Sequence, residues 1–101
     1  MIVVNAVIET TQADIEAMRS ALADMETASR AEEGCHDYTF SVELNDPTRL
    51  RITERWETLE ALQAHFQTPH MAVFQTALAA NPPLNLDVKF LDANEIASPF
   101  G

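Results

Sequence analysis

Residues 35–57 read CHDYTFSVELNDPTRLRITERWE, two segments in which side chains alternate on either side of an Asn45-Asp46-Pro47 turn. Alternation with a period of two is typical of β-strands, and these turn residues predict that the two strands form a hairpin. One face of the first strand is expected to carry His36, Tyr38, Phe40, Val42 and Leu44. One face of the second strand is expected to carry Leu50, Ile52, Glu54 and Trp56.

A strand and a helix are predicted before this hairpin. Residues 2–9, IVVNAVIE, form a β-branched run that is typical of a strand. Thr11 begins a T-x-x-D pattern close to a capping box, and apolar residues then follow at helical spacing to about Arg30. These apolar residues are Ile15, Met18, Leu22 and Met25. Gly34 is expected to end the helix and to turn the chain into the hairpin.

A broken helix and a last strand are predicted after the hairpin. Thr58 is a candidate N-cap for one helix, and Thr68-Pro69 ends that helix and starts the next. The second of these helices is expected to carry Val73, Phe74, Ala77 and Leu78 on one side and to stop at Asn81-Pro82-Pro83. Residues 84–91, LNLDVKFL, predict the last strand. The order β-α-β-β-α-β predicts an α+β, ferredoxin-like fold in which residues 1–101 form a single domain.

Helices cover only one face of such a sheet, so the other face must be polar or find a partner. The strand at residues 2–9 is apolar on both faces, with Ile2, Val4, Ala6 and Ile8 on one and Val3 and Val7 on the other. A monomer would expose this second apolar face to water. We therefore predict a homodimer packed sheet face to sheet face.

Composition excludes several classes of partner. The net charge is −10 and Lys89 is the only lysine, so the chain has no basic stripe for nucleic acid or for an anionic membrane surface. No apolar run approaches the roughly 18 residues of a membrane span. The first residues lack the basic region of a signal peptide, and we expect a cytoplasmic protein. Cys35 is the single cysteine, so no internal disulfide or cysteine-based metal site is expected.

Two histidines lie in the stretch AHFQTPHMAVF at residues 64–74. His65 and His70 are five residues apart across a helix break, and no neighbouring carboxylate pair or cysteine completes a ligand set, so no metal site is expected. His70 would lie in the first turn of its helix, where the helix dipole favours a neutral imidazole that can accept a proton. It could equally serve only to start the helix. His65 lies at the edge of an apolar stripe and would face the space between helix and sheet.

Three strand residues could also line a site. Asn5 is a polar amide among valines and isoleucines, and it could hold a substrate oxygen or only bridge to backbone. Trp56 could be core or a binding platform. Glu54, on the same strand face as Trp56, could like Asn5 either contact a substrate or only bond within the protein. The chain has no phosphate-binding glycine loop, no G-x-S-x-G elbow and no flavin or nicotinamide fingerprint. An enzyme of this sequence would act on a small apolar or aromatic molecule without a classical nucleotide cofactor.

The chain resembles the antibiotic biosynthesis monooxygenase domain family over nearly its whole length. The resemblance rests on EEGCHDY at 32–38, ERWE at 54–57 and the stretch from Leu62 to Phe74, which contains the characteristic A-H-x-x-T-P-H-x-x-x-F. It implies a dimeric α+β barrel of ferredoxin-like protomers. It also implies oxidation of quinols or polyketide aromatics by O₂ without metal or flavin. Asn5 and Trp56 look like positions that line the pocket in several members.

The resemblance also bears on haem degradation, which related proteins perform with a histidine further along the third helical segment. This sequence has Phe74 and Gln75 there, which argues against that activity.

The leading hypothesis is a cofactor-independent monooxygenase acting on a small aromatic, quinol-like substrate. His65 would take the phenolic proton and Asn5 would hold a substrate oxygen. The substrate would lie between the sheet and the broken helix, against side chains that include Trp56, Tyr38, Phe66, Phe74 and, at the helix start, His70. The alternatives are a small-molecule binding dimer without activity, a structural dimer whose pocket is filled by side chains, and an isomerase or decarboxylase that needs no O₂.

Overall fold

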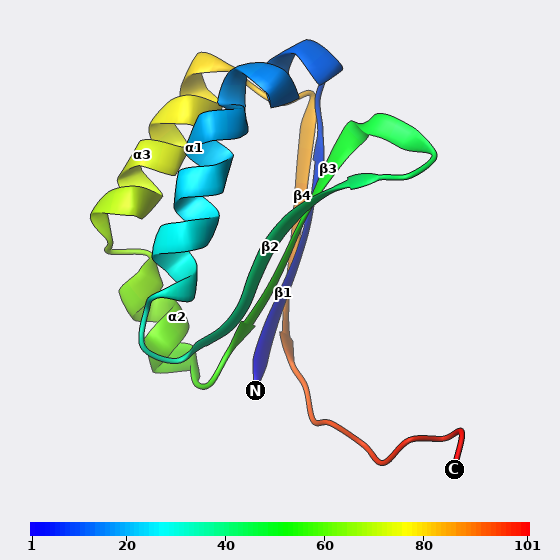
Figure 1. Ribbon diagram of the computed structural model, residues 1–101. Coiled ribbons are helices and arrows are strands. Elements are labelled where there is room, and N and C mark those ends of the chain that lie inside the picture. The colour runs from blue at the N-terminus through cyan, green and yellow to red at the C-terminus, as the bar shows by residue number, and fades with distance from the viewer.

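A four-stranded antiparallel sheet with strand order β2-β3-β1-β4 carries all the helices on one face (Figure 1). The computed structural model describes residues 1–101. Its elements are β1 (Ile2–Glu9), α1 (Gln12–Arg30), β2 (Cys35–Glu43), β3 (Asp46–Trp56), α2 (Leu59–His65), α3 (Pro69–Ala80) and β4 (Asn85–Asp92). This is the predicted α+β, ferredoxin-like order with its second helix broken in two.

Each helix begins at the threonine that the sequence indicated. The Thr11 hydroxyl accepts a hydrogen bond from the backbone N–H of Asp14 at 3.1 Å. Thr58 accepts one from Ala61, also at 3.1 Å. Thr68 caps α3 in the same way, and Pro69 occupies the first turn of that helix. Such caps satisfy backbone donors that the helix itself leaves free, so the helix boundaries follow from local chemistry.

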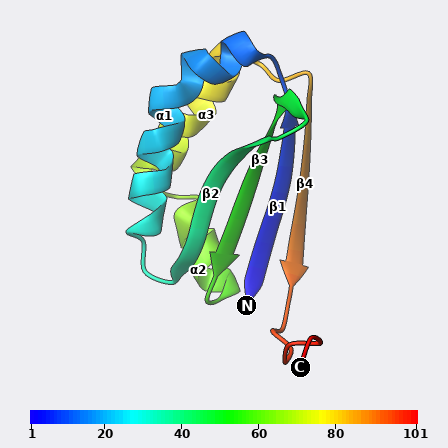
Figure 2. The same ribbon diagram turned by 45° about the vertical axis from the view of Figure 1, so that its right-hand side comes forward.

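The hydrophobic core lies between the helices and the sheet (Figure 2). It is built from Val4, Ala6, Ile8, Ile15, Met18, Leu22, Met25, Tyr38, Leu50, Ile52, Trp56, Leu62 and Phe74. The α3 helix contributes only Phe74 to this buried set, whereas Val73 is exposed, so Val73 does not share the core-facing side of α3 with Phe74 as predicted.

The β2–β3 ladder contains a β-bulge that the alternation did not reveal. Trp56 pairs with Cys35, whereas the preceding Arg55 pairs with Asp37, so His36 is an extra residue on β2. Cys35 therefore packs against the core together with Tyr38, and His36 is exposed beside Glu57, which accepts a hydrogen bond from it. The prediction that His36 shares a face with Tyr38 is wrong because the bulge shifts the register by one residue.

The open face of the sheet is more polar than expected. Its two central rows place Asn5 between Thr53 and Lys89, and Val7 between Arg51 and Asp87. Val3 and Val7 are partly exposed on this face, as predicted, but Asn5 separates them and charged residues lie beside Val7, so the apolar surface left for a partner is smaller than expected. The homodimer stays a prediction.

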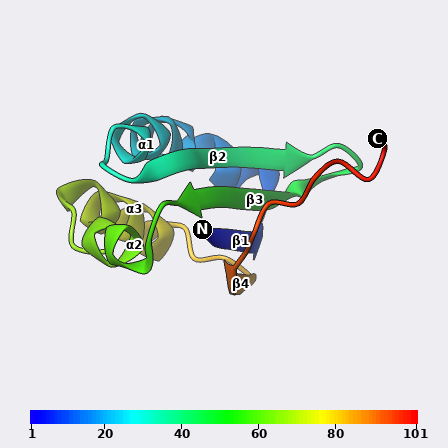
Figure 3. The ribbon, with the colours of Figure 1, turned by 90° about the horizontal axis from the view of Figure 1, so that it is seen from below.

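Exposed apolar side chains gather instead on the edge strand β4. Leu86 and Phe90 pair with Ile8 and Val4 and so point toward the helix side, yet both are exposed. Figure 3 shows the cause: β4 lies at the end of the sheet, beyond β1 and beside the α2 end of the helical layer. Residues 93–101 then leave the domain (Figure 1). None of the helices combines the length and apolarity needed to cross a membrane.

Candidate active site at the helix break

The turn between α1 and β2 is held close to α2. Gly34 has a φ of +83°, and a Cβ at this position would lie 2.7 Å from the Cβ of Ala61. Backbone hydrogen bonds from Glu32 to Ser29 at 3.0 Å and from Cys35 to Glu32 at 3.2 Å fix the turn. Glycine is needed here both for the left-handed backbone and for the close approach. The turn therefore brings Glu32 to the break between α2 and α3.

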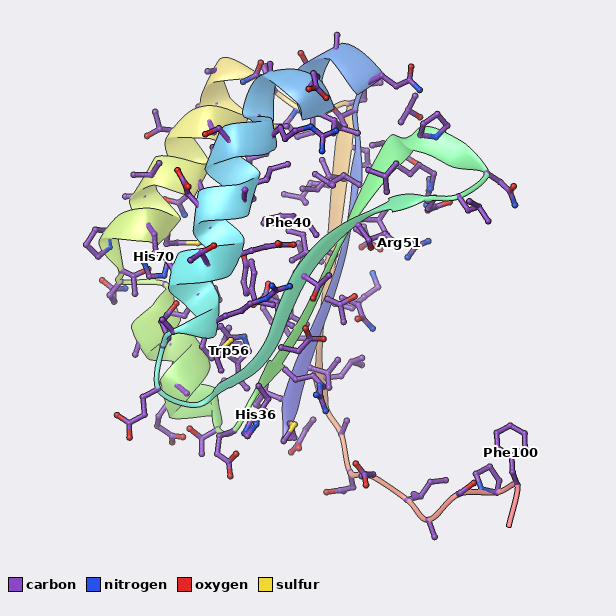
Figure 4. All side chains as sticks on the ribbon, viewed as in Figure 1. His36, Phe40, Arg51, Trp56, His70 and Phe100 are labelled. Atoms are coloured by element: carbon purple, nitrogen blue, oxygen red, sulfur yellow. The ribbon has the colours of Figure 1, made fainter.

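Both histidines of the break contact the same oxygen of Glu32. His65 Nδ1 lies 2.6 Å from Glu32 Oε2, and His70 Nε2 lies 2.7 Å from it. An ionised carboxylate only accepts hydrogen bonds, so these contacts assign a hydrogen to each of the two ring nitrogens. The His65 side chain is 1% exposed, that of Glu32 14% and that of His70 23%. His70, labelled near the start of α3 in Figure 4, is thus the most exposed member of the cluster and His65 the most buried.

Aromatic rings surround the imidazole of His65. Its centroid lies 4.7 Å from that of Trp56 and 5.4 Å from that of Tyr38, and both of these side chains are buried. Burial and the neighbouring carboxylate of Glu54 raise the pKa of the Tyr38 hydroxyl well above its ordinary value, so that this phenol stays protonated. These rings fix the orientation of His65 at its Glu32 contact.

A second carboxyl group, that of Glu54, lies beside Trp56 on the same face of β3. Glu54 is 7% exposed, and its Oε1 accepts a hydrogen bond of 2.9 Å from Trp56 Nε1. Burial raises the pKa of Glu54 from 4.5 to about 7, against the opposing effect of that hydrogen bond. A buried carboxyl group that titrates near neutral pH is typical of functional sites.

An apolar groove of about 280 Å³ lies beside this cluster, between α2 and β4. It is lined by Ile2, Leu59, Leu62, Gln63, Phe66, Phe90, Leu91 and Asp92. The ring of Phe66 lies 5.9 Å from that of His65 and 6.5 Å from that of Phe90, measured between centroids. Phe66 therefore stands between the groove and the buried imidazole.

The structure brings most of the candidate side chains together. His65, His70, Trp56, Tyr38 and Phe66 meet at the break, as the contacts above describe. Phe74 is buried on the same side of the sheet and packs on Phe40, with centroids 5.6 Å apart.

Asn5 does not join them. It is exposed on the open face, because its neighbours Val4 and Ala6 point into the core. The prediction that Asn5 and His65 share a pocket is therefore wrong within one chain.

The prediction that no further ligand lies near His65 and His70 is wrong. Glu32, a carboxylate distant in sequence, completes a group of three donors with His65 and His70. The sequence pattern alone assigns neither Glu32 nor Glu54 a role in the site. The only local signal for Glu32 is its place two residues before Gly34, the only internal glycine.

This fold belongs to a known class of protein. The chain is a member of the antibiotic biosynthesis monooxygenase family, whose sequence model matches residues 1–77, as the resemblance indicated. It is 32% identical over 68 residues to "Probable quinol monooxygenase YgiN" of Escherichia coli, a match that covers 59% of this chain and 64% of that relative's length. The chain thus matches less than two thirds of the relative.

Solved structures agree with this assignment. A "putative antibiotic biosynthesis monooxygenase" from Deinococcus radiodurans has a TM-score of 0.89 at 26% identity, and the match covers all of both chains. Rv0793 from Mycobacterium tuberculosis has a TM-score of 0.83, also at 26% identity, over 96% of this chain and 98% of its own.

Proposed function

We propose that this protein is a monooxygenase that oxidises a small aromatic quinol with O₂. The proposal rests on the surroundings of the His65 imidazole. This ring is hydrogen-bonded to a carboxylate, surrounded by aromatic rings and next to an apolar groove. The name of the Escherichia coli relative supports the same substrate class.

The groove between α2 and β4 suits a substrate of one or two aromatic rings. Its volume of about 280 Å³ lies near the lower end of the range of ligand pockets, and its lining is mostly apolar. Phe66 and Phe90 offer ring faces and edges for stacking. A substrate that displaces the Phe66 side chain would take its place against His65.

The proton step follows from the Glu32 contact. Glu32 holds a hydrogen on His65 Nδ1, so Nε2 of the neutral ring has a lone pair that can accept the phenolic proton. The resulting imidazolium is stabilised by the Glu32 carboxylate, in the manner of a carboxylate–histidine pair. The quinol anion formed in this way is electron-rich and reacts more readily with O₂.

The redox balance needs no external reductant. A hydroquinone and O₂ give a hydroxyquinone and water. One oxygen atom enters the ring by replacing a C–H hydrogen, and the other leaves as water with two hydrogens. The substrate supplies all four electrons, two in becoming a quinone and two in gaining the hydroxyl group. Neither a flavin nor a nicotinamide is therefore required as electron donor.

Oxygen uptake tests the proposal. Purified protein would be assayed with a panel of one- and two-ring hydroquinones, and we expect a rate above autoxidation that saturates with substrate. His65→Gln should lower the rate by about 10²-fold or more, the usual contribution of a general base. His36→Gln, which removes an exposed histidine outside the cluster, is the control and should leave the rate unchanged. Equal rates in the two variants would refute the role of His65.

A second candidate function is binding of the same aromatic compounds without turnover. The observation that favours it is the burial of His65, whose side chain is only 1% exposed. Calorimetry would then show saturable binding of a hydroquinone or its quinone, with oxygen uptake no faster than autoxidation.

A further inference from the structure

We propose that Glu32, His65 and His70 form a binding site for a divalent first-row transition cation such as Zn²⁺. Their donor atoms, Glu32 Oε2, His65 Nδ1 and His70 Nε2, all lie within 4.8 Å of one another. Two imidazoles and one carboxylate are a common ligand set for Zn²⁺ and Fe²⁺, and three protein ligands leave one coordination position open.

All three donor pairs must reach the spacing that a cation sets, including the two imidazole nitrogens, which lie within 4.8 Å of each other. Metal–donor bonds of about 2.0–2.2 Å place neighbouring donors roughly 3.0–3.5 Å apart. The two O···N separations are 2.6 and 2.7 Å, which are hydrogen-bond lengths. Each pair must therefore open by about 0.5 Å when a cation replaces the two hydrogens that now lie between the donors. Movements of this size are within the reach of side-chain rotation.

Each ligand is held in place by its own element. Glu32 is fixed by the turn at Gly34, and His65 by the rings of Trp56 and Tyr38. The backbone of His70 is fixed by the capped first turn of α3. A donor set ordered before the cation arrives loses little side-chain entropy on binding. A cation would enter from the His70 side, where the cluster is partly exposed.

Metal binding would change what His65 can do. With a cation on Nδ1, the hydrogen of the neutral ring lies on Nε2, and that nitrogen can no longer accept a proton. The cation should therefore inhibit the oxidation proposed above. This consequence rests on the proposed function, whereas the site itself rests only on the three donors.

Direct titration tests the site. Metal-free protein would be titrated with Zn²⁺ by calorimetry, with Co²⁺ by visible absorption, and with Mg²⁺, which prefers oxygen ligands. We expect one equivalent of Zn²⁺ or Co²⁺, a higher melting temperature with Zn²⁺, and no response to Mg²⁺ at equal concentration. Glu32→Gln and the partly exposed His70→Gln should each weaken binding at least about tenfold. His36→Gln should bind as the unmodified chain does.

Three results would overturn the site: no saturable binding of Zn²⁺ or Co²⁺, binding that survives both cluster variants, or binding that only His36→Gln removes. The melting temperature of each variant shows whether it is folded. Oxygen uptake with Zn²⁺ separates the two proposals. If one equivalent binds at the cluster and the oxidation continues at full rate, the metal site stands and His65 is not the base.

Discussion

Replacing Glu54 by glutamine should stabilise the protein at alkaline pH and have little effect at acidic pH. Glu54 is a buried carboxyl group in the middle of the sheet, between Tyr38 on β2 and Val4 on β1. Glutamine has the same shape, and its side-chain oxygen can still accept the hydrogen bond from Trp56 Nε1. The substitution therefore removes the charge while it keeps the packing.

The magnitude follows from the pKa of Glu54, which burial raises from 4.5 to about 7. The folded state binds the proton more tightly than the unfolded state does, so stability falls as pH rises from 4.5 to 7 and is constant above that range. A difference of about 2.5 pKa units corresponds to roughly 3 kcal/mol at pH 8. At pH 5 the carboxyl group is protonated in the folded state, and the cost is under about 1 kcal/mol.

Urea unfolding of both proteins at several pH values between 5 and 8 measures this difference. Other ionisable groups are shared by the two chains, so their contributions largely cancel in the comparison. We expect the glutamine variant to gain about 2–3 kcal/mol relative to the parent between pH 5 and pH 8. Parallel pH profiles would refute the reasoning, because they would mean that Glu54 is ionised in the folded state without a desolvation cost.

Three further predictions concern the helix caps, the tight turn and the assembly. Thr68→Ala should lower the free energy of unfolding by about 1 kcal/mol in urea melts, because it removes the cap on Met71, whereas Thr76→Ala in the middle of α3 should cost less. Gly34→Ala should cost roughly 1–2 kcal/mol for its left-handed backbone, with the contact to Ala61 adding to this, and should lower the melting temperature. Light scattering should give twice the chain mass of 11.2 kDa if the homodimer forms, and a value of 11.2 kDa would exclude it.

The order of elements could be predicted because its signals are local. The alternation of Leu50, Ile52 and Glu54 in β3 depends only on near neighbours in sequence, and so do the hydroxyl caps of Thr58 and Thr68. Such signals need no knowledge of the rest of the fold. The boundaries agree with the expectations to within a residue or two, except that β3 begins at Asp46 and not at Leu50, because Asp46 and Pro47 belong to the strand and the turn is formed by Leu44 and Asn45.

The errors arose where strands pair or where distant segments meet. The bulge at His36 is a property of the β2–β3 register, which is set by how Trp56 and Cys35 pair and not by β2 alone. The error at Asn5 is different, because the orientation of this side chain could have been predicted from the sequence. Asn5 alternates with Val4 and Ala6 and must point away from the face that they bury.

The Glu32 cluster could not be predicted because its members are 33 and 38 residues apart along the chain. The helix break is what makes their meeting possible. In a continuous helix, residues 65 and 70 would lie about 140° apart around the axis and about 7.5 Å apart along it, and could not share one oxygen atom. Thr68 and Pro69 interrupt the helix between them, and the two imidazoles then converge on Glu32. The break is thus a requirement of the cluster, and any substitution that makes α2 and α3 continuous should abolish both the cation site and the carboxylate-held base.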